Sequence, residues 1–200
     1  MLSIIQAAGW PIWFLLLCSI IGLALIIERA FSLRSSKILD LRLRDQAYEM
    51  AQHTDLLPEQ LQRLGQASPL GQLYAILLEN RRAPEFVRRQ AAEEVGSAIH
   101  FQLHRYLPAL GTVAVVAPLL GLFGTVIGMI EIFSAYTPQG SDPALLANGI
   151  AMALYNTGFG IMIAVPALIF HRYYRSRADY LLNNLETEAG RFNRFIEQVQ

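Results

Sequence analysis

The fold of this chain is decided by the stretch Ala117-Pro118-Leu119-Leu120-Gly121-Leu122-Phe123-Gly124-Thr125-Val126-Ile127-Gly128-Met129-Ile130. It belongs to a longer segment, from Arg105 to Glu131, with no charged residue between its two ends. An uncharged helix of that length crosses the hydrocarbon core of a bilayer, which is about 30 Å thick. Its glycines, proline and mid-span threonine are unusual for a plain Leu-rich anchor. They favour a helix that packs against other helices and lines a path for something polar.

The charges are strongly segregated along the whole chain. Hydrophobic residues make up 54% of it and charged residues 16%, whereas soluble domains have about 25% charged residues. Residues 1–27, 106–130 and 143–170 are uncharged, and each segment is long enough to span a membrane. The first has neither a basic start nor a small-residue cleavage site, so a retained span from about Trp10 to Ile27 is favoured over a signal peptide.

The basic residues predict the orientation of the spans. All 16 Lys and Arg residues lie between Arg29 and Arg105 or between Arg172 and Arg194. The positive-inside rule therefore places the N-terminus outside, the long 28–105 segment in the cytoplasm, the hairpin between spans two and three outside, and the C-terminus in the cytoplasm. The chain is therefore expected to be a multi-pass membrane protein.

The sequence predicts an all-α chain in which two spans continue far into the cytoplasm as a helical bundle that assembles with copies of itself. Helical spacing is expected to run on past span one to about His53. Breaks at Pro58 and around Gly65 to Pro69 are expected to bracket short helical pieces, followed by one from Leu70 to Glu79. A continuous helix is expected from Pro84 to Ser134, and another from Pro143 into the tail. The predicted segments are 1–30 with span one, 31–105 in the cytoplasm, 106–134 as span two, 135–145 as the external hairpin, 146–171 as span three and 172–200 as the tail.

Small residues recur every three or four positions in spans two and three. Such stripes let helix backbones approach closely, so helix packing is the expected role. The residues predicted to pack in this way are Gly121, Gly124 and Gly128 in span two and Ala153 and Gly160 in span three.

Few polar side chains lie inside the predicted spans. Thr125 and Thr157 lie near mid-span, where a threonine commonly bonds its own helix; as a pair they are also suited to a polar ring in an oligomeric pore. Asn156 is deep enough to need a partner or water, and both structural bonding and pore lining stay open for it. No carboxylate lies inside a span, since Glu28 and Glu131 mark span ends.

The remaining chemical candidates are weak. His100 and His104 have the i, i+4 spacing of metal ligands, but no third ligand accompanies them, so a solvated helix face is favoured. The single cysteine, Cys18, is expected to be a packing residue. No nucleophile–base pair, phosphate-binding loop or metal motif is present. We therefore expect no enzyme activity, no cofactor and no nucleic-acid partner.

Taken together, these residues resemble the MotA/TolQ/ExbB proton-channel family, in its three-span ExbB/TolQ-like branch. The resemblance covers nearly the whole chain, and the span-two motif is its most specific part. The residues that carry it are Gly9-Trp10-Pro11, Ile27-Glu28-Arg29, Arg105 to Leu110, Ala117 to Ile130, Gly149-Ile150-Ala151, Ala153-Leu154, Thr157, Gly160 and Ala164 to Ala167.

The resemblance implies a homopentamer whose pore encloses single transmembrane helices of an ExbD- or TolR-like partner. That partner would supply a membrane aspartate, and the resulting motion would drive a TonB- or TolA-like protein. The family's pore threonines correspond to Thr125 and Thr157. Its span-three glutamate falls at Met152, so this chain departs from the pattern there.

Two other interpretations use the same sequence. A structural scaffold without ion flux agrees with the missing membrane carboxylate. A small-solute transporter is disfavoured, because three spans without detectable inverted repeats do not match transporter folds. The energised process stays open between iron-siderophore uptake, TolQ-like envelope maintenance and surface motility. Whether protons or sodium ions pass does not follow from the residues.

Overall fold

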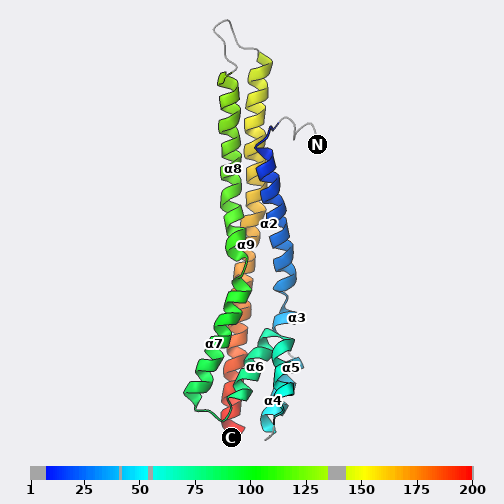
Figure 1. The fold of residues 1–200 in the computed structure, drawn as a ribbon, viewed down its shortest axis with the longest axis vertical. Helices are drawn as coiled ribbons and strands as arrows, with labels where there is room; N and C mark the ends of the chain where they lie inside the picture. Colours follow the sequence, from blue (N-terminus) through cyan, green and yellow to red (C-terminus); the bar gives the residue numbers. More distant parts are fainter. Residues whose placement is uncertain (1–7, 41, 54–55, 135–142, 200) are drawn as a thin grey trace. The chain divides into compact units, whose positions relative to one another are not determined.

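The computed structural model describes residues 8–40, 42–53, 56–134 and 143–199. Within them every regular element is a helix (Figure 1). The chain divides into two compact units. Residues 1–29 and 106–173 form the first, here called the membrane unit, and residues 30–105 and 174–200 form the second, here called the charged unit. The hairpin predicted at 135–145 lies largely outside the described residues.

Three long helices build the membrane unit: α2 (Ile12–Ser32), α8 (Leu107–Ser134) and the first part of α9 (Pro143–Val199). Three helical stretches of the described chain are long and apolar enough to cross a membrane. With 28 residues, α8 is about 42 Å long at the usual rise of about 1.5 Å per residue, which exceeds the thickness of a bilayer core. The chain is therefore an all-helical membrane protein.

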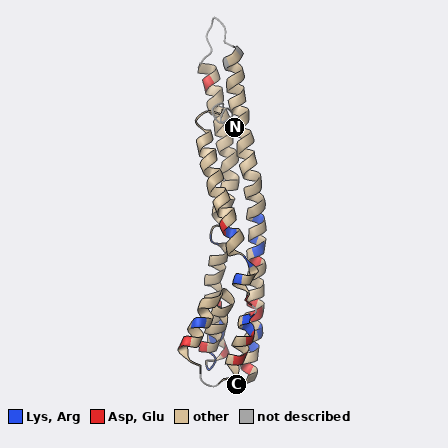
Figure 2. Cartoon of the chain, turned by 90° about the vertical axis from the view of Figure 1, so that its right-hand side faces the viewer, with Lys and Arg blue, Asp and Glu red and all other residues tan. Residues whose placement is uncertain are grey.

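The outer faces of the membrane unit are apolar. Large hydrophobic side chains on all three helices are exposed, among them Trp13, Ile20, Leu119 and Leu154. In water such a surface would be unfavourable, whereas lipid tails solvate it well. Figure 2 shows the corresponding charge distribution. The helices of the membrane unit are almost entirely tan, the colour of residues other than Lys, Arg, Asp and Glu.

The charged unit contains five further helices and the last part of α9. They are α3 (Ser35–Ile38), α4 (Arg42–Gln52), α5 (Pro58–Ala67), α6 (Pro69–Glu79) and α7 (Glu85–His104). Proline opens α5 and α6, where its missing N–H costs nothing. The hydroxyl of Ser68 also caps α6 by accepting a 3.0 Å hydrogen bond from the amide of Gly71.

Aromatic side chains form the core of the charged unit. Tyr74 on α6 and Phe192 on α9 are fully buried, with ring centroids 4.7 Å apart. Tyr48 on α4 joins them at 5.1 Å from Phe192. Leu181 and Leu185, one turn apart on α9, are also fully buried and extend this core.

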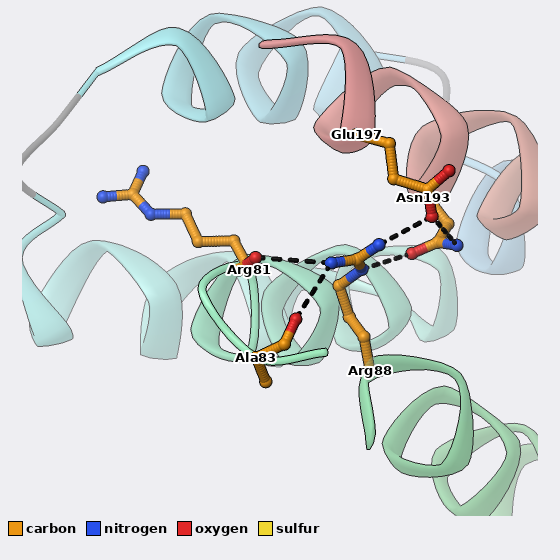
Figure 3. A network of polar contacts seen from close by, with 5 residues as sticks. All are labelled: Arg81, Ala83, Arg88, Asn193 and Glu197. Carbon is orange, nitrogen blue, oxygen red and sulfur yellow. Dashed lines mark hydrogen bonds and ion pairs between the residues drawn. The ribbon is translucent and has the colours of Figure 1, made fainter. Parts of the chain in front are cut away.

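A buried arginine fixes the corner between α6 and α7 to the end of α9 (Figure 3). Arg88 is 2% exposed and donates to the Asn193 side-chain oxygen at 2.6 Å and to Glu197 at 2.7 Å. Its guanidinium also donates to the backbone carbonyls of Arg81 and Ala83, at 3.3 and 3.2 Å. Because its charge is paired and its donors are occupied, burial of Arg88 is tolerated.

Two expectations about helix continuity are wrong. The helix expected from Pro84 to Ser134 is two helices, because α7 ends at His104 and α8 begins at Leu107. Tyr106 between them has a φ of 69°, a backbone conformation that ends a right-handed helix. The overlooked signal is Pro108, which is unfavourable in mid-helix and acceptable in a first turn.

The second discontinuity follows span one. The helix expected to continue to His53 stops at Ser32, and the chain then forms the short α3 and, after a break, α4. The predicted end of that region is correct, since α4 ends at Gln52. The tail helix expected from Pro143 is confirmed, and α9 passes through Pro166 without ending.

Candidate functional site

The contact between α8 and α9 in the membrane unit is made by backbone. A Cβ placed on Gly121 would lie 2.7 Å from the Asn156 carbonyl oxygen and 3.3 Å from the Cα of Gly160. Reciprocally, a Cβ on Gly160 would lie 2.7 Å from the Ala117 carbonyl oxygen and 3.1 Å from the Cα of Gly121. Only glycine permits such an approach without displacing one helix.

The same close approach extends toward the loop between the two helices. A Cβ on Gly128 would lie 3.0 Å from the Gly149 carbonyl oxygen and 3.4 Å from the amide nitrogen of Ala153. The small residues singled out in the two spans thus lie on facing sides of α8 and α9. Together these positions define what we call the α8–α9 seam.

Asn156 is the central polar group of this seam, and it is fully buried. Its amide nitrogen donates to the carbonyl of Ala8 at 2.8 Å and to that of Met152 at 3.0 Å. On the other side its side chain fills the space above Gly124, where a Cβ would lie 2.5 Å from the Asn156 Cγ. Asn156 therefore joins α9, α8 and the segment that precedes α2.

One atom of this junction has no partner within the described chain. The Oδ1 atom of Asn156 is buried and accepts no hydrogen bond. The orientation of the amide is set by the two carbonyl acceptors, which only the NH₂ group can satisfy. Oδ1 is consequently an open acceptor inside the membrane unit, suited to a water or hydroxyl donor.

Met152 lies one turn before Asn156 and is 4% exposed. Its terminal methyl group packs directly on Gly9, where a side chain of any size would collide with it. Gly9 has a φ of 71°, so glycine is favoured there for conformation as well as for space. The position that the family resemblance relates to a glutamate thus holds an apolar contact.

The two threonines lie at the edge of the seam and are half-buried. The Thr125 hydroxyl donates to the carbonyl of Leu122 on its own helix at 2.7 Å. Thr157 is close to α8 through its backbone, since its Cα would lie 3.2 Å from a Cβ on Gly121. Thr125 is one helical turn from Gly121, so both hydroxyls are within about one turn of the same helix contact.

Carboxylates, basic residues and histidine occur only toward the ends of the described spans. Glu28 pairs with the buried Arg29 at 2.5 Å, and the Arg29 guanidinium lies 5.2 Å from the centroid of the Tyr106 ring. Glu131 is exposed near the end of α8. His171 is half-buried, with its Nε2 atom 3.2 Å from where a Cβ on Gly111 would be. Between them the seam offers hydroxyl and amide groups, which form hydrogen bonds and carry no charge at neutral pH.

Sequence reasoning missed two parts of this site. It did not anticipate that Ala8 and Gly9 contact Asn156 and Met152, because a contact with a loop leaves no helical periodicity. It also passed over His171, although 157, 160, 164, 167 and 171 continue the same i, i+3, i+4 spacing. Asn148, about two turns before Asn156 on α9, is exposed.

A membrane unit of three apolar helices, joined along a seam of small residues, defines a class of helical membrane proteins. Comparison with known proteins identifies the class. A profile of the MotA/TolQ/ExbB proton channel family matches residues 49–187. The chain belongs to this family, in its ExbB-like branch.

Individual relatives agree with that placement. Biopolymer transport protein exbB1 of Vibrio cholerae serotype O1 is 32% identical over 202 residues, covering 96% of this chain and 86% of the relative. An ExbB-like biopolymer transport protein of Synechocystis is 32% identical over 194 residues, covering 91% and 90%. The Tol-Pal system protein TolQ of Pseudomonas aeruginosa is 36% identical over 98 residues, or 48% of this chain and 42% of that protein.

Proposed function

We propose that this chain is the channel-forming subunit of an ion-driven motor in a bacterial inner membrane, and that it has no enzyme activity. The observation that supports this most strongly is the similarity to an ExbB biopolymer transport protein along 96% of the chain. The three candidate spans and the tightly packed α8–α9 seam agree with it. Proton motive force would be converted into work on a TonB- or TolA-like protein of the periplasm.

The proposed assembly is a homopentamer around single helices from an ExbD- or TolR-like partner. The exposed apolar faces of α2, α8 and α9 are available for contacts with lipid, further copies and that partner. The partner would supply the titrating aspartate, because no carboxylate lies inside spans two and three of this chain. The distribution of Lys and Arg supports an external N-terminus and a cytoplasmic C-terminus.

Within this assembly Thr125 and Thr157 would line the ion path. Half-burial leaves part of each side chain open to a neighbouring subunit or to the pore. Met152 and Asn156 are buried inside a single subunit. Their part in ion passage would therefore be indirect: they hold the segment before α2 against α9 and so fix the position of the threonines.

The decisive experiment reconstitutes the chain with a single-span partner in liposomes and measures proton uptake under an imposed pH gradient. Thr125→Ala and Thr157→Ala should lower the partner-dependent flux at least tenfold while the complex stays assembled. Thr112→Ala is the matched control, because Thr112 also donates to its own helix, to Pro108 at 3.0 Å, but is exposed near the start of α8. If Thr125→Ala and Thr157→Ala both keep the full proton flux, the two threonines do not line the ion path.

A second candidate is a scaffold that holds a motor complex together without conducting ions. The apolar contact of Met152 with Gly9, at the position related to the family's glutamate, is the observation that favours it. The same liposomes separate the two functions. Absence of flux with every partner tested, in complexes shown to be assembled, would support the scaffold.

A further inference from the structure

Basic residues follow two of the candidate membrane spans directly. Residues 29–39, at the end of α2 and beyond it, contain three basic residues and no acid. Residues 171–178 of α9, which follow its uncharged part, contain three arginines and no acid. Arg34 and Arg177 each lie five residues after the first arginine of their segment, a distance of about 8 Å along a helix. Because a lipid headgroup layer is about 5–8 Å thick, both arginines are expected at its depth.

Arg34 and Arg177 belong to chain segments that touch within the charged unit. The guanidinium of Arg177 on α9 donates to the hydroxyl of Ser35, the first residue of α3. Arg34 precedes Ser35 directly, so two arginines 143 positions apart are brought into the same part of this unit. Their like charges repel each other there, and a bound anion would relieve the repulsion.

The two guanidiniums lie against aromatic rings rather than against acids. The Cζ atom of Arg34 is 4.7 Å from the centroid of the Phe31 ring, and that of Arg177 is 5.5 Å from the centroid of the Tyr180 ring. Neither guanidinium has a carboxylate within ion-pair distance among the residues that the structure describes. Stacking on a ring uses the face of a guanidinium and leaves its N–H edges available for a phosphate group.

The environment of Arg177 differs from that of the two buried arginines described above. Arg29 and Arg88 are buried, and each binds a carboxylate. Arg177 is half-buried, yet its hydrogen-bond partner is the neutral hydroxyl of Ser35. A guanidinium has five N–H donors, and a partly desolvated positive charge is unfavourable until an anion compensates it. Arg177 is therefore suited to an anion that the chain itself does not supply.

We propose that Arg34 and Arg177, assisted by Lys37, bind the phosphate group of an anionic phospholipid. The two guanidiniums donate to the phosphate oxygens, and the exposed ammonium of Lys37 on α3 adds to the local positive charge. The rings of Phe31 and Tyr180 are 52% and 57% exposed, and they contact the glycerol part of the lipid, as aromatic rings do at membrane interfaces.

A soluble phosphate compound would use the same N–H groups, but two observations favour a lipid. Arg34 lies two residues after the end of the candidate span Ile12–Ser32, so it cannot be far from the headgroup layer of the membrane that this span crosses. The exposed aromatic rings beside both arginines also suit a ligand that is partly apolar. This lipid site does not depend on what the membrane unit conducts, and it is tested separately from the proposed function.

The test measures lipid binding to the full-length protein in a neutral detergent at an ionic strength of about 0.1 M. Native mass spectrometry counts the lipids bound during titration with phosphatidylglycerol, which is anionic, or with phosphatidylcholine of the same acyl chains, which has no net charge. Phosphatidylglycerol should bind at least about fivefold more tightly. Arg34→Gln, Lys37→Gln and Arg177→Gln should each weaken its binding about two- to fivefold and leave phosphatidylcholine binding unchanged.

Two charge-matched controls separate a defined site from a diffuse positive field. Arg63→Gln and Arg82→Gln remove exposed arginines of the charged unit that are remote along the chain from the spans, and neither should change lipid binding. If these variants weaken phosphatidylglycerol binding as much as Arg34→Gln does, or if the two lipids bind equally well, the proposal is wrong.

Two further measurements cover the remaining outcomes. Inorganic phosphate at about 10 mM, compared with chloride at equal ionic strength, should not displace phosphatidylglycerol; displacement would indicate a site for soluble anions and overturn the lipid assignment. The melting temperature without lipid checks the fold of each variant. Arg177→Gln keeps an amide that can donate to Ser35, and if it is nevertheless less stable, Arg34→Gln and Lys37→Gln decide the question.

Discussion

Gly121 of α8 and Gly160 of α9 meet backbone to backbone: a Cβ on Gly160 would lie 3.1 Å from the Cα of Gly121. The carbonyl oxygen of Ala117 would be closer still, at 2.7 Å. Neither obstacle is the tip of a flexible side chain that can move aside. A single methyl group at this contact must therefore separate the helices.

We expect Gly160→Ala to destabilise the protein by about 1–3 kcal/mol, the usual cost of overpacking a tight contact. Gly158→Ala is the control two residues away, because a Cβ there meets nothing within 4 Å. It should be neutral or slightly stabilising, since alanine is the better helix former. Thermal unfolding in detergent measures both. Equal melting temperatures for the two variants would contradict the packing described for the seam.

Asn156→Leu should release the segment that precedes α2. The change removes the donor to the Ala8 carbonyl and leaves that buried oxygen unpaired, at a cost of about 1–3 kcal/mol. Limited proteolysis before Ile12 should become faster, and the melting temperature should fall. Asn184→Leu is matched to it, because Asn184 donates only to the carbonyl of Tyr180 on its own helix. That variant should leave proteolysis unchanged.

Met152→Leu should keep the stability within about 1.5 kcal/mol, because the volume and polarity of the buried side chain are conserved. Met152→Glu places a carboxylate against Gly9 in the same apolar contact and should be clearly less stable. Denaturation of the two variants in one detergent compares them directly. A stable Met152→Glu protein with raised proton flux would show that the site still accommodates an acid.

Arg88→Met should destabilise the charged unit, by about 1–3 kcal/mol for each acceptor left buried without a donor, because it removes the hydrogen bonds to Asn193 and to two backbone carbonyls. Arg89→Met, at the next residue, is the control. Its ion pair with Glu93 is exposed on both sides and should contribute less than about 1 kcal/mol. Chemical denaturation that gave similar losses for both variants would argue against the network in Figure 3.

The Tyr74 hydroxyl is buried without a hydrogen-bond partner among the described residues. Burial raises the pKa of Tyr74 well above the ordinary value for tyrosine, and the Glu188 carboxylate raises this pKa further. The folded state therefore holds the Tyr74 proton more tightly than the unfolded state does. This group leaves the free energy of unfolding unchanged below about pH 10 and lowers it as the pH rises above that value.

Tyr74→Phe should accordingly be neutral or stabilising at neutral pH, since it removes an unpaired polar atom and keeps the ring packed against Phe192. The variant should also lose less stability than the unchanged protein between about pH 9 and about pH 11. Thermal unfolding across this range checks both statements. A large loss at neutral pH would mean that the hydroxyl has a partner after all.

Much of the helical architecture was predictable because lipid leaves few alternatives. In lipid, uncharged segments must form the hydrogen bonds of their backbone internally, so they become helices. Prolines in the sequence indicated the starts of α5, α6 and α7 to within one or two residues. The breaks after Ser32 and at Tyr106 were missed because apolar spacing continues across them. Pro108 was a local signal for the second break, whereas Leu33 and Arg34 offer none.

The site was only partly predictable for a related reason. Periodicity indicates which face of a helix is small or polar, and it selected Gly121, Gly160 and Thr157. Periodicity does not indicate which loop covers that face. The contact of Asn156 with Ala8 joins residues 148 positions apart, so only the folded chain reveals it.

The small residues of the α8–α9 seam also affect the entropy that the chain loses when the two helices pack together. Larger side chains lose rotamer freedom when two helices pack, whereas glycine and alanine have almost none to lose. The extra backbone entropy that glycine forfeits is lost when each segment becomes helical in the bilayer, before the helices meet. Joining α8 to α9 therefore costs the chain little conformational entropy, so the dispersion contacts between the two backbones are opposed by little.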